Sequence, residues 1–188
     1  NSVTVSFQGN LDSALPSQIY LGKSDTSAAS PILAQGAGNS FAIKGNIPGS
    51  IAFGTVGNGA GGTSDNFLDS FSVYANKGSI FANTGSIFTD GGTTAGVSLE
   101  GSISFKPADG GSTLTIDTDQ SGINNAGDIT LQGFIATVYG QTGSLVLDTR
   151  SSGSFDSGLV NSLNANTNLA GDLTVYTSSQ SDSGPVTL

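Results

Sequence analysis

The sequence predicts an all-β protein: an immunoglobulin-like or jelly-roll β-sandwich with an extended N-terminal donor-strand arm. Three observations support this prediction. Apolar and polar residues alternate over many short segments rich in Val, Ile, Thr and Phe, as a half-buried strand requires. Clusters of Gly, Asn and Asp separate these segments and indicate turns. Apolar spacing of three and four residues is nowhere sustained beyond about two helical turns.

The first eleven residues form the most regular predicted strand. Its alternating apolar residues are Val3, Val5, Phe7 and Leu11. A turn-like segment, 12–16, follows. Two interpretations remain open: an ordinary first strand, or a donor strand that completes the sheet of a neighbouring subunit. We therefore divide the chain into an N-terminal arm, 1–11, and a single sandwich domain, 12–188.

The body of the chain contains further predicted strands at intervals. Many short strands separated by turns favour a sandwich or barrel. One short helix is predicted over 155–163, and two loose regions over 57–66 and 148–168. The predicted strands are 67–74, 97–105, 114–118, 129–138, 144–147 and 173–176.

A short motif recurs along the chain: Gly, then Ser or Asp, then an apolar residue. The spacing between copies is irregular, whereas a solenoid usually shows a steady period. We therefore interpret the copies as strand starts after turns and not as rungs of a β-helix. The motif begins at Gly78, Gly85, Gly101, Gly127, Gly143 and Gly171.

The composition excludes several classes of function. Charged residues make up 10% of the chain, and its net charge is −9; ordinary soluble domains carry about 25% charged residues. The five cations are scattered, which argues against binding to nucleic acid or to an anionic membrane. No apolar run approaches the roughly 20 residues that span a bilayer. A chain that starts at Asn1 fits removal of a signal peptide, so we expect an extracellular or cell-surface location.

Catalysis is not expected. The chain has no His and no Cys, which removes the usual triads and thiol nucleophiles and ordinary zinc sites. No phosphate-binding loop is present. Carboxylates could form a glycosidase pair, but the chain has four Tyr and no Trp for stacking on sugars. We predict a protein that is not an enzyme and requires no cofactor.

One segment could nevertheless bind calcium. Oxygen-bearing residues occupy positions 1, 3, 5, 9 and 12 of the segment 117–128, with Gly122 at position 6. This spacing resembles the calcium loops of EF-hands and dockerins, although position 12 is not Glu and the flanks predict strands. The alternative is a polar hairpin turn stabilised by side-chain to backbone hydrogen bonds. The candidate ligands are Asp117, Asp119, Ser121, Asn125 and Asp128.

The alternating segment 1–11, the all-β body and the late segment 169–177, LAGDLTVYT, resemble donor-strand-complemented pilins of the chaperone–usher type. The resemblance implies a secreted fimbrial subunit with an incomplete sandwich, and a secretion chaperone or assembly platform as partner. The chain departs from that family because it is long and continues past Thr177.

These observations together predict a structural subunit of an extracellular filament such as a pilus, fimbria or thread. Identical subunits would polymerise by donor-strand complementation, with Val3, Val5, Phe7 and Leu11 inserted into the neighbour, and the filament would have a role in surface attachment. Two alternatives stay open. One is a β-helical or sandwich adhesin fragment, and the other is a viral or phage coat protein.

Overall fold

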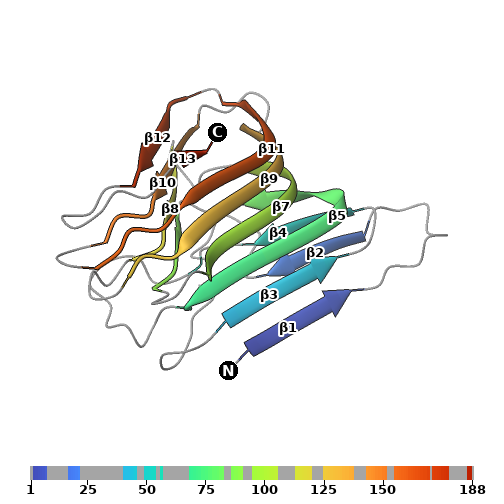
Figure 1. The fold of residues 1–188 in the computed structure, drawn as a ribbon. Coiled ribbons are helices and arrows are strands. Elements are labelled where there is room, and N and C mark those ends of the chain that lie inside the picture. Colours follow the sequence, from blue (N-terminus) through green and yellow to red (C-terminus); the bar gives the residue numbers. More distant parts are fainter. Residues whose placement is uncertain are drawn as a thin grey trace.

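The computed structural model shows a chain built from strands (Figure 1). Two sheets are present, and every pairing between named strands is parallel. The described part contains no helix, and therefore none that is long and apolar enough to cross a membrane. The structure describes residues 2–7, 17–21, 40–45, 49–53, 56, 68–82, 86–90, 95–105, 113–119, 125–137, 143–151, 155–169, 171–177 and 186–187.

The larger sheet, sheet A, has nine strands, and the smaller, sheet B, has four. Sheet A contains β1 (Ser2–Phe7), β2 (Ser17–Leu21), β3 (Ser40–Gly45), β4 (Gly49–Phe53), β5 (Ser70–Ala82), β7 (Ala95–Phe105), β9 (Asp128–Thr137), β11 (Val160–Asn168) and β13 (Val186–Thr187). Sheet B contains β6 (Ser86–Phe88), β8 (Thr113–Asp117), β10 (Ser144–Asp148) and β12 (Leu173–Tyr176).

From β5 onward the chain alternates strictly between the two sheets. From β7 onward each strand pairs with the strand two elements before it, so β9 lies on β7 and β10 lies on β8. Parallel strands usually need a helical crossover. Here the crossover is made by a strand of the other sheet, so the chain winds as a coil, the arrangement of a parallel β-helix.

The sandwich prediction is therefore wrong. Immunoglobulin-like and jelly-roll sandwiches are built from antiparallel strands, whereas these sheets are parallel. The expected free arm is wrong as well, because β1 pairs with β3 of its own chain from Ser2↔Ser40 to Phe7↔Gly45. The short helix predicted over 155–163 is also wrong: Phe155 precedes the strand, and Val160 begins β11.

The recurring Gly motif does mark rungs of the coil. Ile80 pairs with Ile103, and Leu145 pairs with Leu173. Four copies stand at strand starts, as interpreted, because β6, β9, β10 and β12 begin directly after Gly85, Gly127, Gly143 and Asp172. The copies at Gly78 and Gly101 lie inside β5 and β7. The exclusion of β-helix rungs was wrong, because these strands lie on successive coils. The loops between them vary in length, which hides the period from the sequence.

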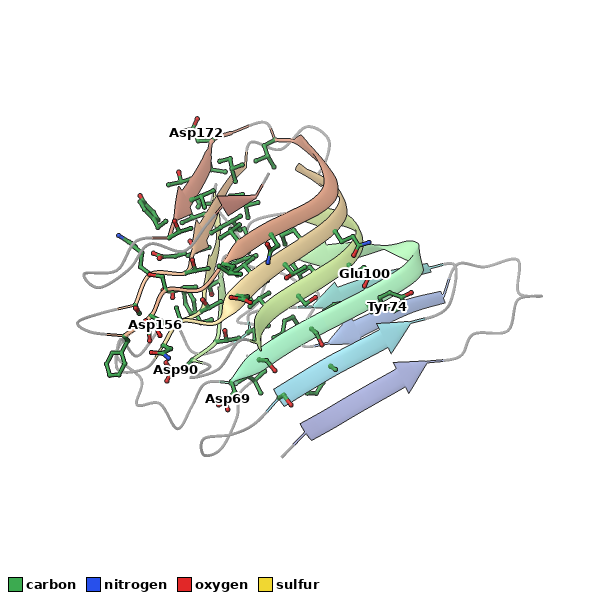
Figure 2. All side chains as sticks on the ribbon, viewed as in Figure 1. Asp69, Tyr74, Asp90, Glu100, Asp156 and Asp172 are labelled. Atoms are coloured by element: carbon green, nitrogen blue, oxygen red, sulfur yellow. The ribbon has the colours of Figure 1, made fainter. Side chains whose placement is uncertain are left out.

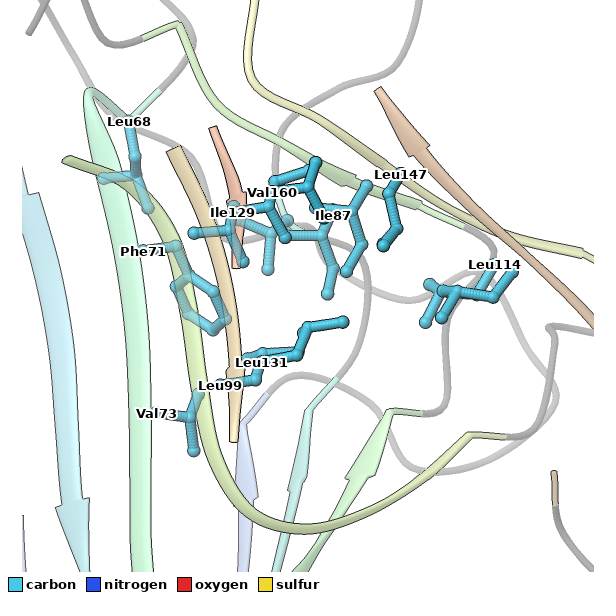
Figure 3. Close-up of a cluster of buried hydrophobic side chains, with 14 residues drawn as sticks. Leu68, Phe71, Val73, Ile87, Leu99, Leu114, Ile129, Leu131, Leu147 and Val160 are labelled. Atoms are coloured by element: carbon cyan, nitrogen blue, oxygen red, sulfur yellow. The ribbon is translucent and has the colours of Figure 1, made fainter. Parts of the chain in front are cut away.

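Apolar side chains from both sheets fill the interior of the coil (Figure 3). Strands β8 and β10 alternate between half-buried and buried residues, and equivalent inward residues stack from coil to coil. In sheet B the column runs through Ile87, Ile116, Leu147 and Val175. In sheet A it runs through Phe41, Phe71, Val97, Ile129 and Val160.

Sheet A bends where the registers of β5 with β7 and of β9 with β11 shift. Gly101 in β7 and Gly133 in β9 lie at this bend, with φ values of 127° and 109°. A Cβ on Gly133 would lie 2.2 Å from the carbonyl oxygen of Gly101. Positive φ explains why both positions are glycine, and at Gly133 the close approach of the backbone adds a second reason.

Candidate functional site

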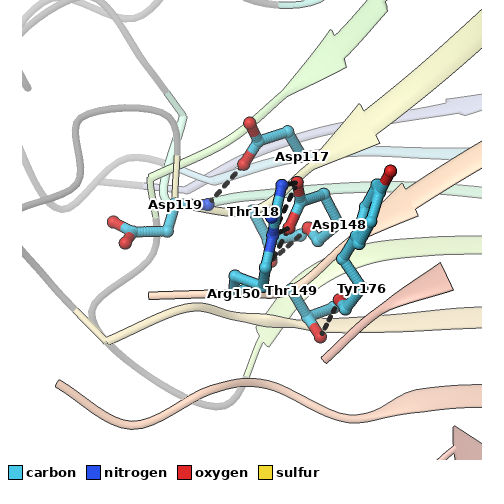
Figure 4. A network of polar contacts seen from close by, with 7 residues as sticks. All are labelled: Asp117, Thr118, Asp119, Asp148, Thr149, Arg150 and Tyr176. Atoms are coloured by element: carbon cyan, nitrogen blue, oxygen red, sulfur yellow. Dashed lines mark hydrogen bonds and ion pairs between the residues drawn. The ribbon is translucent and has the colours of Figure 1, made fainter. Parts of the chain in front are cut away.

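A network of polar contacts lies at the corner where the chain leaves sheet B (Figure 4). The strand ends of β8, β10 and β12 bring Asp117, Asp148 and Tyr176 into one column, in register on adjacent coils. The next residue in each coil is a threonine. We call this region the strand-end corner.

Buried threonines stack along the strand-end corner. Thr89, Thr118 and Thr149 are each 0% exposed. The Thr118 hydroxyl donates to the carbonyl of Gly127 at 2.7 Å, and the Thr149 hydroxyl donates to the carbonyl of Gly158 at 3.0 Å. Each acceptor lies nine residues after its threonine.

The same residues are also joined through the backbone. The amide of Gly127 donates to the carbonyl of Thr118 at 3.4 Å, and that of Gly158 donates to the carbonyl of Thr149 at 3.0 Å. Each loop is therefore closed at its base by a threonine and a glycine, which we call the Thr–Gly clasp. The amide of Thr118 donates to the carbonyl of Asp148, and so each clasp is also tied to the next coil.

Thr89 holds the equivalent place without a clasp. Its hydroxyl is buried and has no hydrogen-bond partner within the described part of the chain. The position nine residues later, Ser98, already lies inside β7. The connection from sheet B to sheet A is thus shorter in sequence in this coil than in the two coils that follow.

Because Thr118 forms a clasp and Thr89 does not, the same substitution at the two positions should have different effects on stability. Thr118→Val should lower the free energy of unfolding by about 1–3 kcal/mol, because the buried carbonyl of Gly127 loses a donor. Thr89→Val should leave stability unchanged or raise it, because it removes a buried hydroxyl with no partner. Urea unfolding of both variants checks the pair. Equal losses in the two variants would show that the clasp adds nothing to stability.

The carboxylates of this corner are held by local hydrogen bonds. Asp117 accepts from the amide of Asp119 at 3.0 Å, and Asp148 accepts from the amide of Arg150 at 3.0 Å. The guanidinium of Arg150 also forms an ion pair with both oxygens of Asp148. It lies 4.0 Å from the centre of the Tyr176 ring, a cation–π geometry.

Burial raises the pKa of the Asp117 carboxyl from 3.8 to about 6, and the negative charges of Asp148 and Asp90 act in the same direction. The hydrogen bond from Asp119 and the charge of Arg150 oppose this rise. Ionised Asp117 therefore destabilises the folded chain. This penalty is absent below pH 3.8, grows up to about pH 6 and is complete above it.

We therefore expect Asp117→Asn to raise the thermal unfolding midpoint more at pH 8 than at pH 4. The amide oxygen of Asn can still accept the hydrogen bond from Asp119. The control is Asp172→Asn, which removes a charge at an exposed position and should change the midpoint equally at both pH values. A gain from Asp117→Asn that does not depend on pH would contradict a raised pKa at this carboxyl.

The predicted calcium ligands do not converge in the part of the chain that is described. Asn125 accepts from the amide of Asp156 at 3.0 Å, and Asp128 accepts from the amide of Leu159 at 2.8 Å. Both reach 31 residues ahead, to the next coil. Ser121 lies outside the described residues. No group of three or more acidic, His or Cys side chains that could hold a metal ion occurs among the described residues, and calcium binding stays a prediction.

The hairpin alternative for the same segment is wrong, because β8 and β9 belong to different sheets. Thr118 and Gly127, near the two ends of the segment, form a Thr–Gly clasp instead. Of the predicted arm residues, Val3, Val5 and Phe7 lie in β1, and their side chains are outside the described part of the structure. Leu11 lies outside the described residues altogether.

No family model, curated protein or solved structure matches this chain. The clasp threonines were missed in the sequence. One signal could have found them: of the three Asp-Thr dipeptides in the chain, those at 117–118 and 148–149 directly follow an alternating apolar segment, whereas the one at 25–26 does not.

Proposed function

We propose that the chain is a structural unit of an extracellular filament, in which coils stack along one axis and the outer faces make surface contacts. The observation that carries this proposal is the repeated coil itself. Adjacent coils place the same kind of residue at the same inward position and close their loops with the same clasp. Such a fold is a one-dimensional stack to which further coils can be added.

The outer faces support a structural role. In sheet B one outward column consists of Ser86, Thr115, Val146 and Thr174. In sheet A another consists of Ser72, Ser98, Thr130 and Asn161. Neither column contains a charged residue. Larger side chains such as Tyr74 and Glu100, which pair on β5 and β7, lie beside the sheet A column (Figure 2).

One observation favours a second function, glycoside hydrolysis. Asp117 and Asp148 are neighbours on adjacent strands, and the raised pKa of Asp117 suits a general acid. The partner carboxylate must be available to attack the sugar or to activate water. Here both oxygens of Asp148 are taken by the Arg150 guanidinium. The arrangement therefore favours a structural use of this pair.

The filament that we propose is the one predicted from the sequence, but its subunits are joined in a different way. Donor-strand complementation needs a free strand and an open groove, and β1 already pairs with β3. A coil can instead lengthen through the edge strands at its ends. The adhesin alternative shares the β-helical fold and differs in its assembly, because it requires a solitary unit that binds a receptor.

Sedimentation and negative-stain microscopy over a range of concentrations test the proposal. We expect rods of uniform width that lengthen as the concentration rises. Fibre diffraction should give a reflection near about 4.8 Å along the rod axis, the spacing of paired strands.

Two results would contradict the filament. One is a monomer of fixed size at every concentration, which would favour the adhesin alternative. The other is cleavage of a polysaccharide by the parent protein that is lost in Asp117→Asn, which would favour the hydrolase.

A further inference from the structure

A column of aromatic and acidic residues crosses the outer face of sheet B. Phe88, Asp117, Asp148 and Tyr176 end the strands β6, β8, β10 and β12, and the strand registers place them side by side on successive coils. Phe88 and the two acidic residues are half-buried, whereas Tyr176 is 41% exposed. Adjacent strands lie about 4.8 Å apart, so this Phe88–Tyr176 column extends for roughly 14 Å along the coil axis.

Arg150 lies over this column in a fixed position (Figure 4). Its Nε and Nη2 groups donate to the oxygens of Asp148, and its guanidinium lies 4.0 Å from the centre of the Tyr176 ring. Nη1 takes no part in these contacts, and 47% of the side chain is exposed. The guanidinium is therefore held in place before a ligand arrives, so little conformational entropy is lost when it donates further hydrogen bonds.

A column of short, uncharged side chains runs beside the Phe88–Tyr176 column. These residues lie two positions earlier on the same strands and present hydroxyl and methyl groups. A sugar has C–H groups on its ring faces and hydroxyl groups around its rim, so it suits apolar surface next to a few fixed polar groups. The short residues are Ser86, Thr115, Val146 and Thr174.

The charges of the Phe88–Tyr176 column favour a neutral ligand. A cationic ligand would meet Arg150 first, because 47% of the Arg150 side chain is exposed and only 15% of that of Asp148. An anionic ligand would meet the acidic groups of Asp117 and Asp148, while the charge of Arg150 is already balanced by its ion pair with Asp148. Neutral hydroxyl groups can both donate to carboxylate oxygens and accept from Nη1.

We propose that the Phe88–Tyr176 column binds a neutral polysaccharide, which lies along the coil axis with one sugar packed against the exposed part of Tyr176. The distance from rung to rung is close to the length of one pyranose unit in an extended chain, so successive sugars meet successive rungs. This inference rests on the surface contacts of the proposed filament and names their ligand.

Isothermal titration calorimetry with neutral hexasaccharides tests the proposal, with cellohexaose, xylohexaose, mannohexaose and laminarihexaose as probes. Tyr176→Ala removes the ring, and Arg150→Lys keeps the charge but loses the two-pronged contact with Asp148. Tyr176→Phe keeps the ring. The matched control is Tyr74→Ala, which removes a half-buried tyrosine beside Glu100 on sheet A. Thermal unfolding of each variant checks that it is folded.

We expect the parent, Tyr176→Phe and Tyr74→Ala to bind at least one of these hexasaccharides with similar affinity. Tyr176→Ala and Arg150→Lys should bind the same hexasaccharide at least tenfold more weakly. Nuclear magnetic resonance of the parent provides a second measurement that needs no variant. The ring signals of Tyr176 should shift on titration with that hexasaccharide, whereas those of Tyr74 should not.

The outcomes separate the binding column from the filament. Absence of binding to every neutral hexasaccharide, or tighter binding to hexamers of glucosamine or galacturonic acid, would overturn the proposed ligand. Equal losses in Tyr74→Ala and Tyr176→Ala would overturn the position of the site. Sedimentation of the same solutions tests the filament: a monomer that binds sugar would overturn the filament alone, and rods that bind no sugar would overturn the binding column alone.

Discussion

Gly133→Ala is expected to lower the free energy of unfolding by about 3 kcal/mol or more. The residue has a φ of 109°, which a non-glycine residue adopts at a cost of about 1–3 kcal/mol. The new Cβ would also lie 2.2 Å from the carbonyl oxygen of Gly101, so the backbone of two coils must move apart. Steric strain of this kind typically adds about 1–3 kcal/mol.

Urea unfolding followed by far-ultraviolet circular dichroism measures this loss. The control is Gln132→Ala, at the neighbouring half-buried position of β9, which should change stability by no more than about 0.5 kcal/mol. A Gly133→Ala variant as stable as Gln132→Ala would mean that sheet A does not bend at this residue.

Ile116→Ala is expected to cost about 2–5 kcal/mol, the range for removing a large aliphatic side chain from a packed core. The side chain is 1% exposed and lies in the column between Ile87 and Leu147. Its removal leaves a cavity in the middle of this column of side chains. The coils on both sides restrict the movement of the residues around the cavity, so the core cannot easily collapse to fill it.

Thermal and urea unfolding check this loss, with two comparisons. Ile116→Val should cost only about 0.5–1.5 kcal/mol. Thr115→Ala, on the outward side of the same strand, should cost less still. If Thr115→Ala were as damaging as Ile116→Ala, the inward and outward sides of β8 would have been assigned the wrong way round.

The positions of several strands could be predicted because alternation is a local property of the sequence. The predicted strand 173–176 coincides with β12, and the prediction 129–138 differs from β9 by one residue at each end. The helix predicted over 155–163 rested on the spacing of four apolar residues. The burial of Val160 beside the exposed Phe155 shows that this spacing does not reflect one helical face.

How the strands pair could not be predicted, because parallel and antiparallel partners leave the same alternation in each strand. Turn residues between 119 and 125 suggested a hairpin, yet the flanking strands lie in different sheets. The hydrogen bonds of the corner link residues 27 to 31 positions apart, and this variable interval hides the repeat. The clasps form only where the coils stack on one another. The residues next to each threonine in the sequence therefore gave little indication of its role.

The Thr–Gly clasps have a consequence for how this protein could change its length. Thr118 and Thr149 meet equivalent partners on the same loop and on the next coil. The stretch between them can therefore be duplicated or excised as a unit, with matching junctions on either side. Growth or shortening would proceed in whole steps of about 4.8 Å along the axis, and an insertion of any other size would have to be accommodated within a loop.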